Sequence, residues 1–174
     1  MGIEHTTSRD EFINAMRRVA ACVTVVTTDG SAGRLGATVS AFSSVSADPP
    51  TILVCLRANS RIAGAVSENQ AFCVNVLAEK ADGIADRFAG AHDKLVSDRF
   101  MDVACRGDNG IPPEIIGATV FACIVDQIVT SGSHLVVFGR VQKVHNGDIE
   151  PLAYLDGAYH SVTPKPVQNF GKQN

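Results

Sequence analysis

The chain has 174 residues and a formal net charge of −3, from 15 lysines and arginines against 18 aspartates and glutamates. This length is typical of one domain with its own core, so we expect a single domain over residues 1–174 with its core at about 12–162. No basic block suits a phosphate backbone, which disfavours nucleic acid as a partner.

The apolar runs are too short to span a bilayer, which takes about 20 consecutive residues. The N-terminal sequence MGIEHTTSRDEF lacks the basic start and apolar stretch of a signal peptide. We therefore expect a cytoplasmic protein with no membrane segment. The five cysteines are odd in number and form no CxxC pair, which argues against a disulfide framework or a metal site. Four of them stand in apolar runs, where cysteine usually behaves as a small buried hydrophobe: Cys22, Cys55, Cys73 and Cys123.

The first half of the chain predicts three helices and four strands. Residues 6–20 place hydroxyls before acids and then space apolar side chains as in a helix, and residues 21–42 predict a hairpin around an Asp-Gly turn. After a diproline, TILVCL is almost wholly apolar, as in a strand buried on both faces. A short helix capped by Asn59 or Ser60, a strand AFCVNVL and a helix ended by Gly90 follow.

The second half is dominated by a hairpin. Residues 91–113 are polar and irregular, whereas residues 118–132 and 133–148 are two long β-rich runs joined by a Ser-Gly-Ser turn. The tail adds one short turn-strand element. Because most strands follow one another through short turns, we expect a mainly antiparallel barrel rather than a doubly wound α/β sheet, which needs helical crossovers and a Gly-rich phosphate loop.

A hydroxyl-rich run, GATVSAFSSVSADPP at 36–50, is the most unusual part of the sequence. About ten residues after it come Asn59, Ser60 and Arg61, at a predicted helix start. Hydroxyls, backbone amides and one guanidinium could together hold a phosphate or a polar heteroaromatic ring. A Ser/Thr-rich strand edge beside a capped helix is the alternative that the pattern leaves open.

Six blocks in order resemble the short-chain flavin reductase family: GATVSAFSSVSADPPTILVCL, NSR, AFCVNVL, ADRFAG, SGSHLVVFGRV and PLAYLDGAYHSV. Its members are the NAD(P)H:flavin oxidoreductase components of two-component flavin-dependent monooxygenases. The likeness extends from about Phe12 to Val162. It implies a mainly β fold, a flavin-binding split β-barrel of about six antiparallel strands of Greek-key type with a few flanking helices, working as a homodimer.

The resemblance also implies a reaction and its ligands. Hydride would pass from NADH, or NADPH, to FMN or FAD, and the reduced flavin would go to a separate monooxygenase. The resemblance assigns flavin contacts to Gly36, Ala37, Thr38, Val39, Ser40, Ala41, Ser44, Cys55, Leu56, Arg57, Asn59, Ser60, Arg61, Arg87 and Phe88. For Phe88, packing in the core is an equally good interpretation. The main alternative is a flavin-binding or haem-binding split-barrel module without nicotinamide turnover, and a weaker one is a relative of pyridoxine-phosphate oxidase.

The nicotinamide side of the site rests on three further residues. The family carries a Gly-Asp-His motif at the hairpin, with the histidine near the nicotinamide, and this chain has Gly132-Ser133-His134. The resemblance therefore gives His134 a catalytic role without its usual acidic neighbour, so that we expect a modest effect on rate. Tyr154 and Gly157 match a segment that borders the nicotinamide pocket.

Overall fold

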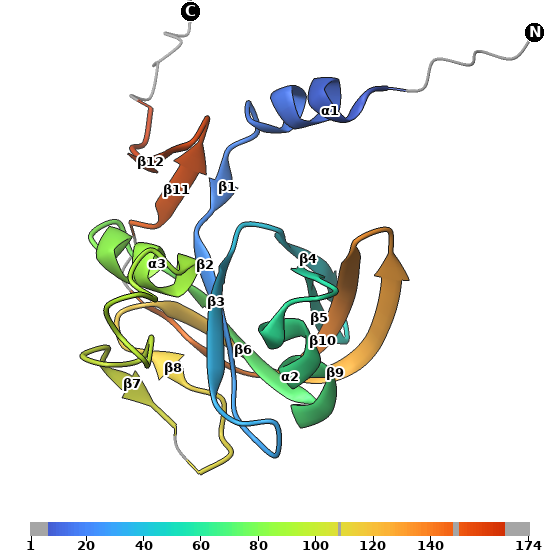
Figure 1. Ribbon diagram of the computed structural model, residues 1–174, viewed down its shortest axis with the longest axis vertical. Helices are drawn as coiled ribbons and strands as arrows, with labels where there is room; N and C mark the ends of the chain where they lie inside the picture. Colours follow the sequence, from blue (N-terminus) through green and yellow to red (C-terminus); the bar gives the residue numbers. More distant parts are fainter. Residues whose placement is uncertain (1–6, 108, 148–149, 166–174) are drawn as a thin grey trace, which may run out of the picture.

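Seven antiparallel strands form the main sheet of the computed structural model, which describes residues 7–107, 109–147 and 150–165 (Figure 1). Their order across the sheet is β3-β2-β6-β9-β10-β5-β4. The bounds are β2 Thr24–Thr28, β3 Leu35–Val39, β4 Phe42–Ala47, β5 Pro50–Arg57, β6 Ala71–Val76, β9 Thr119–Ser131 and β10 His134–His145. The sheet curls around its own core, which confirms the expected barrel.

The hydroxyl-rich run divides between the two edges of this sheet. The predicted hairpin is present as β2 and β3, with Thr28 paired to Leu35. The chain then leaves β3 and enters β4 after only Ser40 and Ala41, although these strands are at opposite ends of the strand order. Residues 36–47 therefore connect the two edges of the curled sheet and close it on that side.

Two helices lie against the barrel, as the sequence predicts. Helix α2, Arg61–Asn69, begins at Ser60, whose hydroxyl accepts a hydrogen bond from the Ala63 amide, and ends at Gln70 in the left-handed conformation. Helix α3, Asp82–Ala89, ends at Gly90 with φ of 94°, a conformation that favours glycine. Two clusters of buried apolar side chains fill the space between the sheet and these helices, with Phe72 in one and Phe88 in the other.

Strand β5 differs from its prediction. Ile52, Val54 and Leu56 are buried, but Leu53 and Cys55 between them are only half-buried. Its neighbour β4 is an edge strand, and in a single chain the outer face of β5 has no layer packed fully over it. Strand β5 thus has more apolar side chains than one copy of the chain buries fully.

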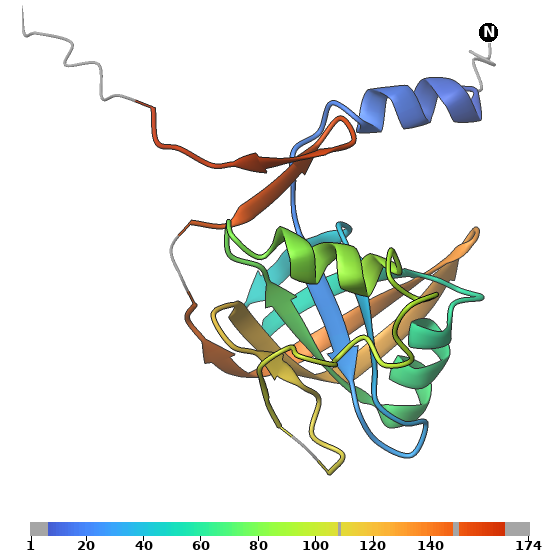
Figure 2. The same cartoon turned by 60° about the vertical axis from the view of Figure 1, so that its left-hand side comes forward.

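The first helix and the tail project away from the barrel (Figure 2). Helix α1, Arg9–Met16, has the expected start, a capping box between Ser8 and Glu11, but it buries none of its residues. Strand β1, Ala21–Cys22, pairs with β11, Leu152–Leu155, and β11 pairs with β12, Ala158–Ser161. The tail is thus a hairpin joined to a third strand, more than the one element predicted.

Short strands account for most of the excess over the predicted six. Strands β7, Cys105–Arg106, and β8, Glu114–Ile115, lie in and just after the stretch expected to be irregular, and two residues are too few to show a period. The five thiols are free, and Cys73 and Cys123 are buried as expected. Cys22 is exposed instead, because β1 lies outside the barrel. No helix in the described part of the chain is long and apolar enough to cross a membrane.

Candidate functional site

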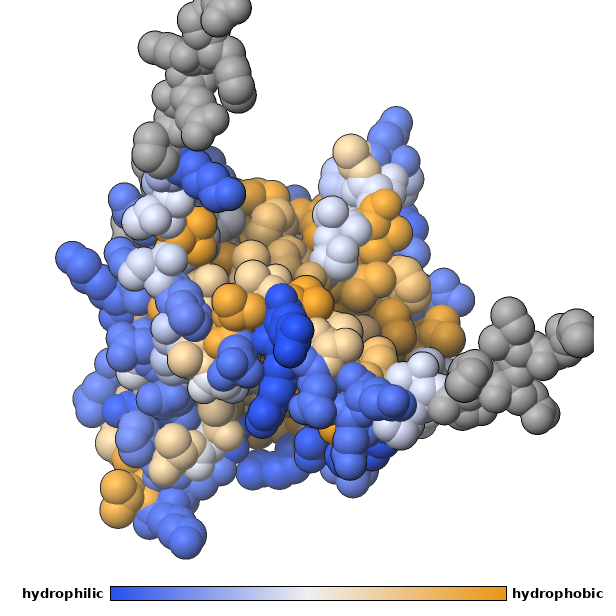
Figure 3. Space-filling view, turned by 90° about the horizontal axis from the view of Figure 1, so that it is seen from above, coloured by the Kyte–Doolittle hydropathy of each residue, from blue (hydrophilic) through white to orange (hydrophobic). Residues whose placement is uncertain are grey.

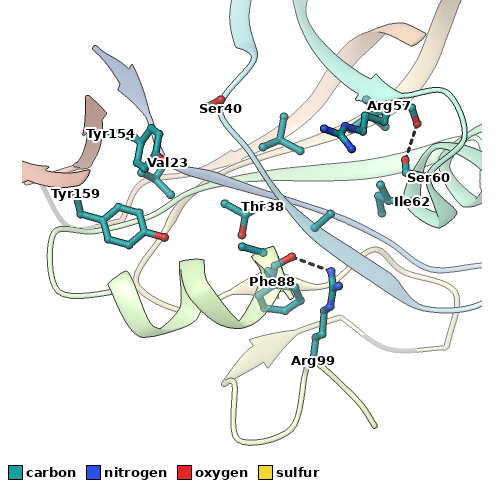
Figure 4. A pocket seen from close by; sticks show the side chains of 14 residues that line it. Val23, Thr38, Ser40, Arg57, Ser60, Ile62, Phe88, Arg99, Tyr154 and Tyr159 are labelled. Carbon is teal, nitrogen blue, oxygen red and sulfur yellow. Dashed lines mark hydrogen bonds between the residues drawn. The ribbon is translucent and has the colours of Figure 1, made fainter. Parts of the chain in front are cut away.

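Two adjoining cavities open beside β3 and the start of α2. The first has a volume of about 510 Å³ and the second about 670 Å³, both within the usual size of a small-molecule site. Both are lined by Ala37, Ser60, Ile62 and Arg99. The first is also lined by Val23, Thr38, Val39, Ser40, Leu56, Arg57, Phe88, Ala89, Tyr154 and Tyr159 (Figure 4).

Strand β3 forms one wall of both cavities. It pairs with β2 on one side only and is an edge of the main sheet in the described chain, so its other edge has backbone groups that no neighbouring strand uses. One of these groups, the Gly36 carbonyl, accepts a hydrogen bond from Arg99 at 3.3 Å. The Thr38 hydroxyl is already occupied, since it donates to the Ala85 carbonyl at 2.6 Å. The wall therefore offers backbone polar groups and small side chains more than free hydroxyls.

The turn between β5 and α2 supplies positive charge and hydrogen-bond donors. The Ser60 hydroxyl donates to the Arg57 carbonyl at 2.6 Å, which fixes the turn just before the helix (Figure 4). Arg57 lines the first cavity and Arg61 the second, and both are exposed. Neither is in an ion pair among the described residues. Two guanidiniums at a helix start form a suitable site for an anion.

Arg99 connects several segments of the chain at the far side of the two cavities. Its guanidinium makes a two-point ion pair with Asp93, at 2.8 and 2.6 Å. It also donates to the Phe88 carbonyl at 2.8 Å (Figure 4). This ion pair lowers the pKa of Asp93 below its usual value and raises that of Arg99. We refer to Arg99, Asp93 and these carbonyl contacts as the Arg99 clasp. It ties the loop after α3 to the end of that helix and to β3.

The Phe88 ring packs directly against Gly36 of strand β3. A side chain at Gly36 would come within 2.5 Å of the Phe88 ring, so only glycine fits there. Phe88 in turn packs edge-on against Phe100, with ring centroids 4.9 Å apart. The small residue at 36 thus serves the packing of an aromatic pair beneath the strand.

Two tyrosines lie at the other end of the first cavity (Figure 4). The ring centroids of Tyr154 and Tyr159 are 5.8 Å apart, and the Tyr159 hydroxyl donates to the Asp86 carboxylate at 2.8 Å. Burial, together with this hydrogen bond, raises the pKa of Tyr159 to about 12. It therefore remains a protonated donor at neutral pH.

The structure brings most of the sequence-predicted site residues together. The first cavity is lined by Ala37, Thr38, Val39, Ser40, Leu56, Arg57, Ser60, Phe88 and Tyr154, and the second adds Gly36 and Arg61. Outside both linings are Ala41, Ser44, Cys55, Asn59, Arg87, His134 and Gly157. Of these, Arg87 donates to the Met101 carbonyl.

His134 lies next to the turn that carries Arg57. It pairs with Arg57 across β10 and β5, and the Ser133 carbonyl accepts a hydrogen bond from the Ala58 amide at 3.0 Å. The Ser133 hydroxyl, in the position of the family's acid, is 3.0 Å from the His134 Nδ1 atom. The exposed imidazole therefore keeps a polar partner, but a neutral one.

Sequence reasoning missed Arg99, Phe100, Asp93 and Tyr159. A signal for two of them was present, because Asp-Arg-Phe occurs twice, at 86–88 and 98–100, and only the first copy was assigned to the site. In the first copy only the phenylalanine lines a cavity, and in the second copy all three residues do. Because the sequence around the second copy has no regular period, it does not indicate where that copy lies in the fold.

The lining of the first cavity limits its chemistry. Its described residues include hydroxyls, arginines and apolar side chains but no histidine, cysteine, lysine or carboxylate. It thus lacks the pairing of nucleophile and base that hydrolytic or acyl-transfer chemistry needs. Apolar walls, unused strand amides and arginines at a helix start fit a planar heteroaromatic ring with a phosphate arm, such as a flavin.

Comparison with known proteins points the same way. The family model described as "Flavin reductase like domain" matches residues 16–163. The FMN reductase (NADH) RutF of Pantoea ananatis is 37% identical over 91% of this chain and 84% of its own length. The flavin reductase of styrene monooxygenase from Pseudomonas putida S12 superposes with a TM-score of 0.77 at 27% identity, over 90% of this chain and 99% of its own.

A third relative was solved with ligands. The NADH:FAD oxidoreductase SgcE6 of Streptomyces globisporus C-1027, in complex with NAD and FAD fragments, superposes with a TM-score of 0.81 at 26% identity. The match covers 90% of this chain and 94% of that one. With a family model that matches most of its length and a relative that is 37% identical, this chain belongs to the flavin reductase like domain family.

Proposed function

We propose that this protein is an NADH-dependent flavin reductase that transfers hydride to FMN or FAD. The observation that carries the proposal is the first cavity, which joins apolar walls and free strand amides to arginines while lacking a nucleophile and base. When bound, the flavin supplies the redox chemistry, accepting hydride from the nicotinamide. The relatives named FMN reductase (NADH) and the reductase components of two-component monooxygenases support this activity.

The residues of the chain then have binding and positioning roles. Ala37, Val39 and Leu56 would flank the ring, with the backbone of β3 offering hydrogen bonds to its polar edge. Ser60 and Arg61 would hold the ribityl phosphate, because a helix start and a guanidinium both favour an anion. The enclosure aligns two bound rings and limits water, and alignment alone can be worth several kcal/mol of barrier.

The second ring would lie across the first cavity, between the tyrosines at one end and the hairpin end beside Arg57 at the other (Figure 4). Tyr154 lines the first cavity, Gly157 forms the adjoining turn, and His134 lies beside Arg57. We assign these three residues to the nicotinamide, with His134 orienting it. NADH is the expected donor, since the NADH-named relatives favour it, and NADPH is the secondary candidate.

The reduced flavin would leave for a separate monooxygenase component. The flavin reductase of styrene monooxygenase and a homologue of nitrilotriacetate monooxygenase component B, which are both similar to this chain, support this assignment. We place the reaction in the cytoplasm, because the five thiols are free and a reducing compartment keeps them so. We also propose a homodimer, because helix α1 exposes apolar side chains that a second copy of the chain could cover.

The decisive experiment mixes purified protein, FMN and NADH, and follows the loss of the reduced nicotinamide absorbance. We expect many turnovers per protein with excess FMN, under anaerobic and aerobic conditions alike until the acceptor is consumed. A flavin that binds but is never reduced would instead identify a storage or sensing module. A haem that binds in preference to FMN would identify the haem-binding alternative.

A further inference from the structure

The second cavity is more than a mononucleotide flavin requires. It has a volume of about 670 Å³, comparable with the first, and it adjoins the first through Ala37, Ser60, Ile62 and Arg99. If the ring lies in the first cavity and its phosphate at Ser60 and Arg61, the ligand already reaches the boundary between the two. A longer ligand would continue into the second cavity.

The charges of this cavity are suited to an anion. Arg34, Arg61 and Arg99 line it, together with Asp93 and Asp98. Asp93 forms an ion pair with Arg99 in the clasp. An Asp98 oxygen accepts a hydrogen bond from the Phe100 amide at 2.9 Å. A local excess of positive charge in a chain of net charge −3 attracts an acidic ligand.

Arg34 is held in place without being neutralised. Its guanidinium lies over the Phe100 ring, 4.1 Å from the ring centroid, and the side chain is otherwise exposed. No ion pair of the described residues involves it. Arg34 also makes a hydrogen bond with the Cys105 thiol. A guanidinium has several N–H donors, so one that is positioned by a ring and a thiol still has donors for a phosphate oxygen.

The remaining walls are apolar. Leu35, Ile62, Val96 and Phe100 line the cavity alongside the arginines. Arginines alone would suit a free phosphate, whereas arginines beside apolar side chains suit a phosphate that carries a sugar and a flat base.

We propose that the second cavity binds the adenosine diphosphate end of a dinucleotide, with Arg34 as the residue that recognises it. The inference rests on the proposed flavin reductase function and extends it, because it separates dinucleotide from mononucleotide ligands. FAD and NADH share this end, so the experiment has an arm for each.

The test compares FMN and FAD affinity in the full-length chain by titration of flavin fluorescence, which requires no turnover. Arg34→Gln should weaken FAD binding about tenfold, equivalent to ~1.4 kcal/mol, and change FMN affinity less than about twofold. Arg106→Gln is the matched control, since Arg106 is an exposed arginine that lines neither cavity. Ser97→Glu is a second variant, which adds a negative charge to the cavity wall without touching Arg34 and should act in the same direction.

The NADH arm measures the KM for NADH with FMN as acceptor. Weaker FAD binding with an unchanged KM assigns the cavity to FAD, and a raised KM with unchanged FAD affinity assigns it to NADH. Either result supports the proposal. It is overturned if Arg34→Gln and Ser97→Glu alter neither quantity, or if they weaken FMN and FAD equally. Because the titrations need no NADH, failure of the reductase function would not be mistaken for failure of this proposal.

Discussion

His134 is a residue whose position depends on strand register more than on cavity shape. Pairing with Arg57 places it at the hairpin end beside the first cavity, and Ser133 supplies a neutral partner for its ring. A hydroxyl is a neutral hydrogen-bond partner and holds the ring less firmly than a carboxylate would. His134 therefore assists the reaction modestly in the mechanism proposed above.

We predict that His134→Ala slows reduction by NADH about tenfold, or roughly 1.4 kcal/mol, and leaves flavin affinity nearly unchanged. Stopped-flow reduction at saturating flavin measures the rate, and a flavin titration on the same variant is the control. Wild-type kinetics in the Ala variant would remove His134 from the site.

Sequence reasoning found site residues best where a motif coincides with an element boundary. Ser60 and Arg61 follow an apolar strand and open a helix, so both their location and their chemistry could be predicted. Arg99 stands in an irregular stretch, and its contacts with Gly36 and Phe88 come from residues 63 and 11 positions away. No local pattern carries that information, since it depends on how the loop folds back on the barrel.

At the scale of elements, the Arg99 clasp joins the loop after α3 to the site. Its ion pair lowers the Asp93 pKa, so its contribution to stability is fully present above the unfolded-state pKa of about 3.9 and is lost as pH falls through the lower folded-state pKa. We predict that Asp93→Asn lowers the melting temperature at neutral pH. The difference from wild type should vanish in acid, once the pH is below the lowered folded-state pKa of Asp93.

Thermal denaturation across this pH range measures the effect, with Asp10→Asn as the matched control. Asp10 lies 3.9 Å from Arg9 in a pair that is almost fully exposed, and such pairs contribute little. A loss of stability in Asp93→Asn that persists unchanged to low pH would show that the ion pair is not its cause. Flavin affinity should fall in the same variant at neutral pH, because Arg99 lines both cavities.

Helices and strands with long, regular patterns were predicted correctly, whereas the order of the strands in the sheet was not predicted. The hairpins β2–β3 and β9–β10 and helices α2 and α3 follow from turn residues, caps and periodicity. Local sequence does not predict that residues 36–47 are divided between opposite edges of the sheet. Each part has the pattern of a strand, and only the way the sheet closes into a barrel places the two strands at different edges. Likewise, the apolar run in β5 predicts burial on both faces, but a single chain covers only one of them fully.

The whole molecule leaves apolar surface uncovered. Helix α1 exposes Phe12, Ile13 and Met16 by 60%, 36% and 48%, and it buries no residue of its own. Val19, just after the helix, is 53% exposed. Apolar side chains gather across the face that is seen from above, which includes α1 and the tail hairpin (Figure 3). Isolated helices of eight residues are marginal in water, so α1 needs a partner surface. A second copy of the chain would provide one, and it would also cover the half-buried outer face of β5.

We therefore predict that light scattering gives about twice the monomer mass of 18.3 kDa at micromolar concentration. The double variant Phe12→Asp and Met16→Asp should shift the protein toward monomer, because two charges on the exposed face of α1 would be desolvated by the partner. Leu95→Asp is the matched control: Leu95 is 82% exposed and lies in the loop after α3, so the dimer should persist.

A monomeric wild-type chain would contradict the assembly, and a dimer unaffected by the α1 charges would place the interface elsewhere, on the outer face of β5 and its neighbours. If α1 is at the interface, the flavin affinity of the monomerised variant indicates whether the cavities are complete within one chain, as their lining by a single copy predicts.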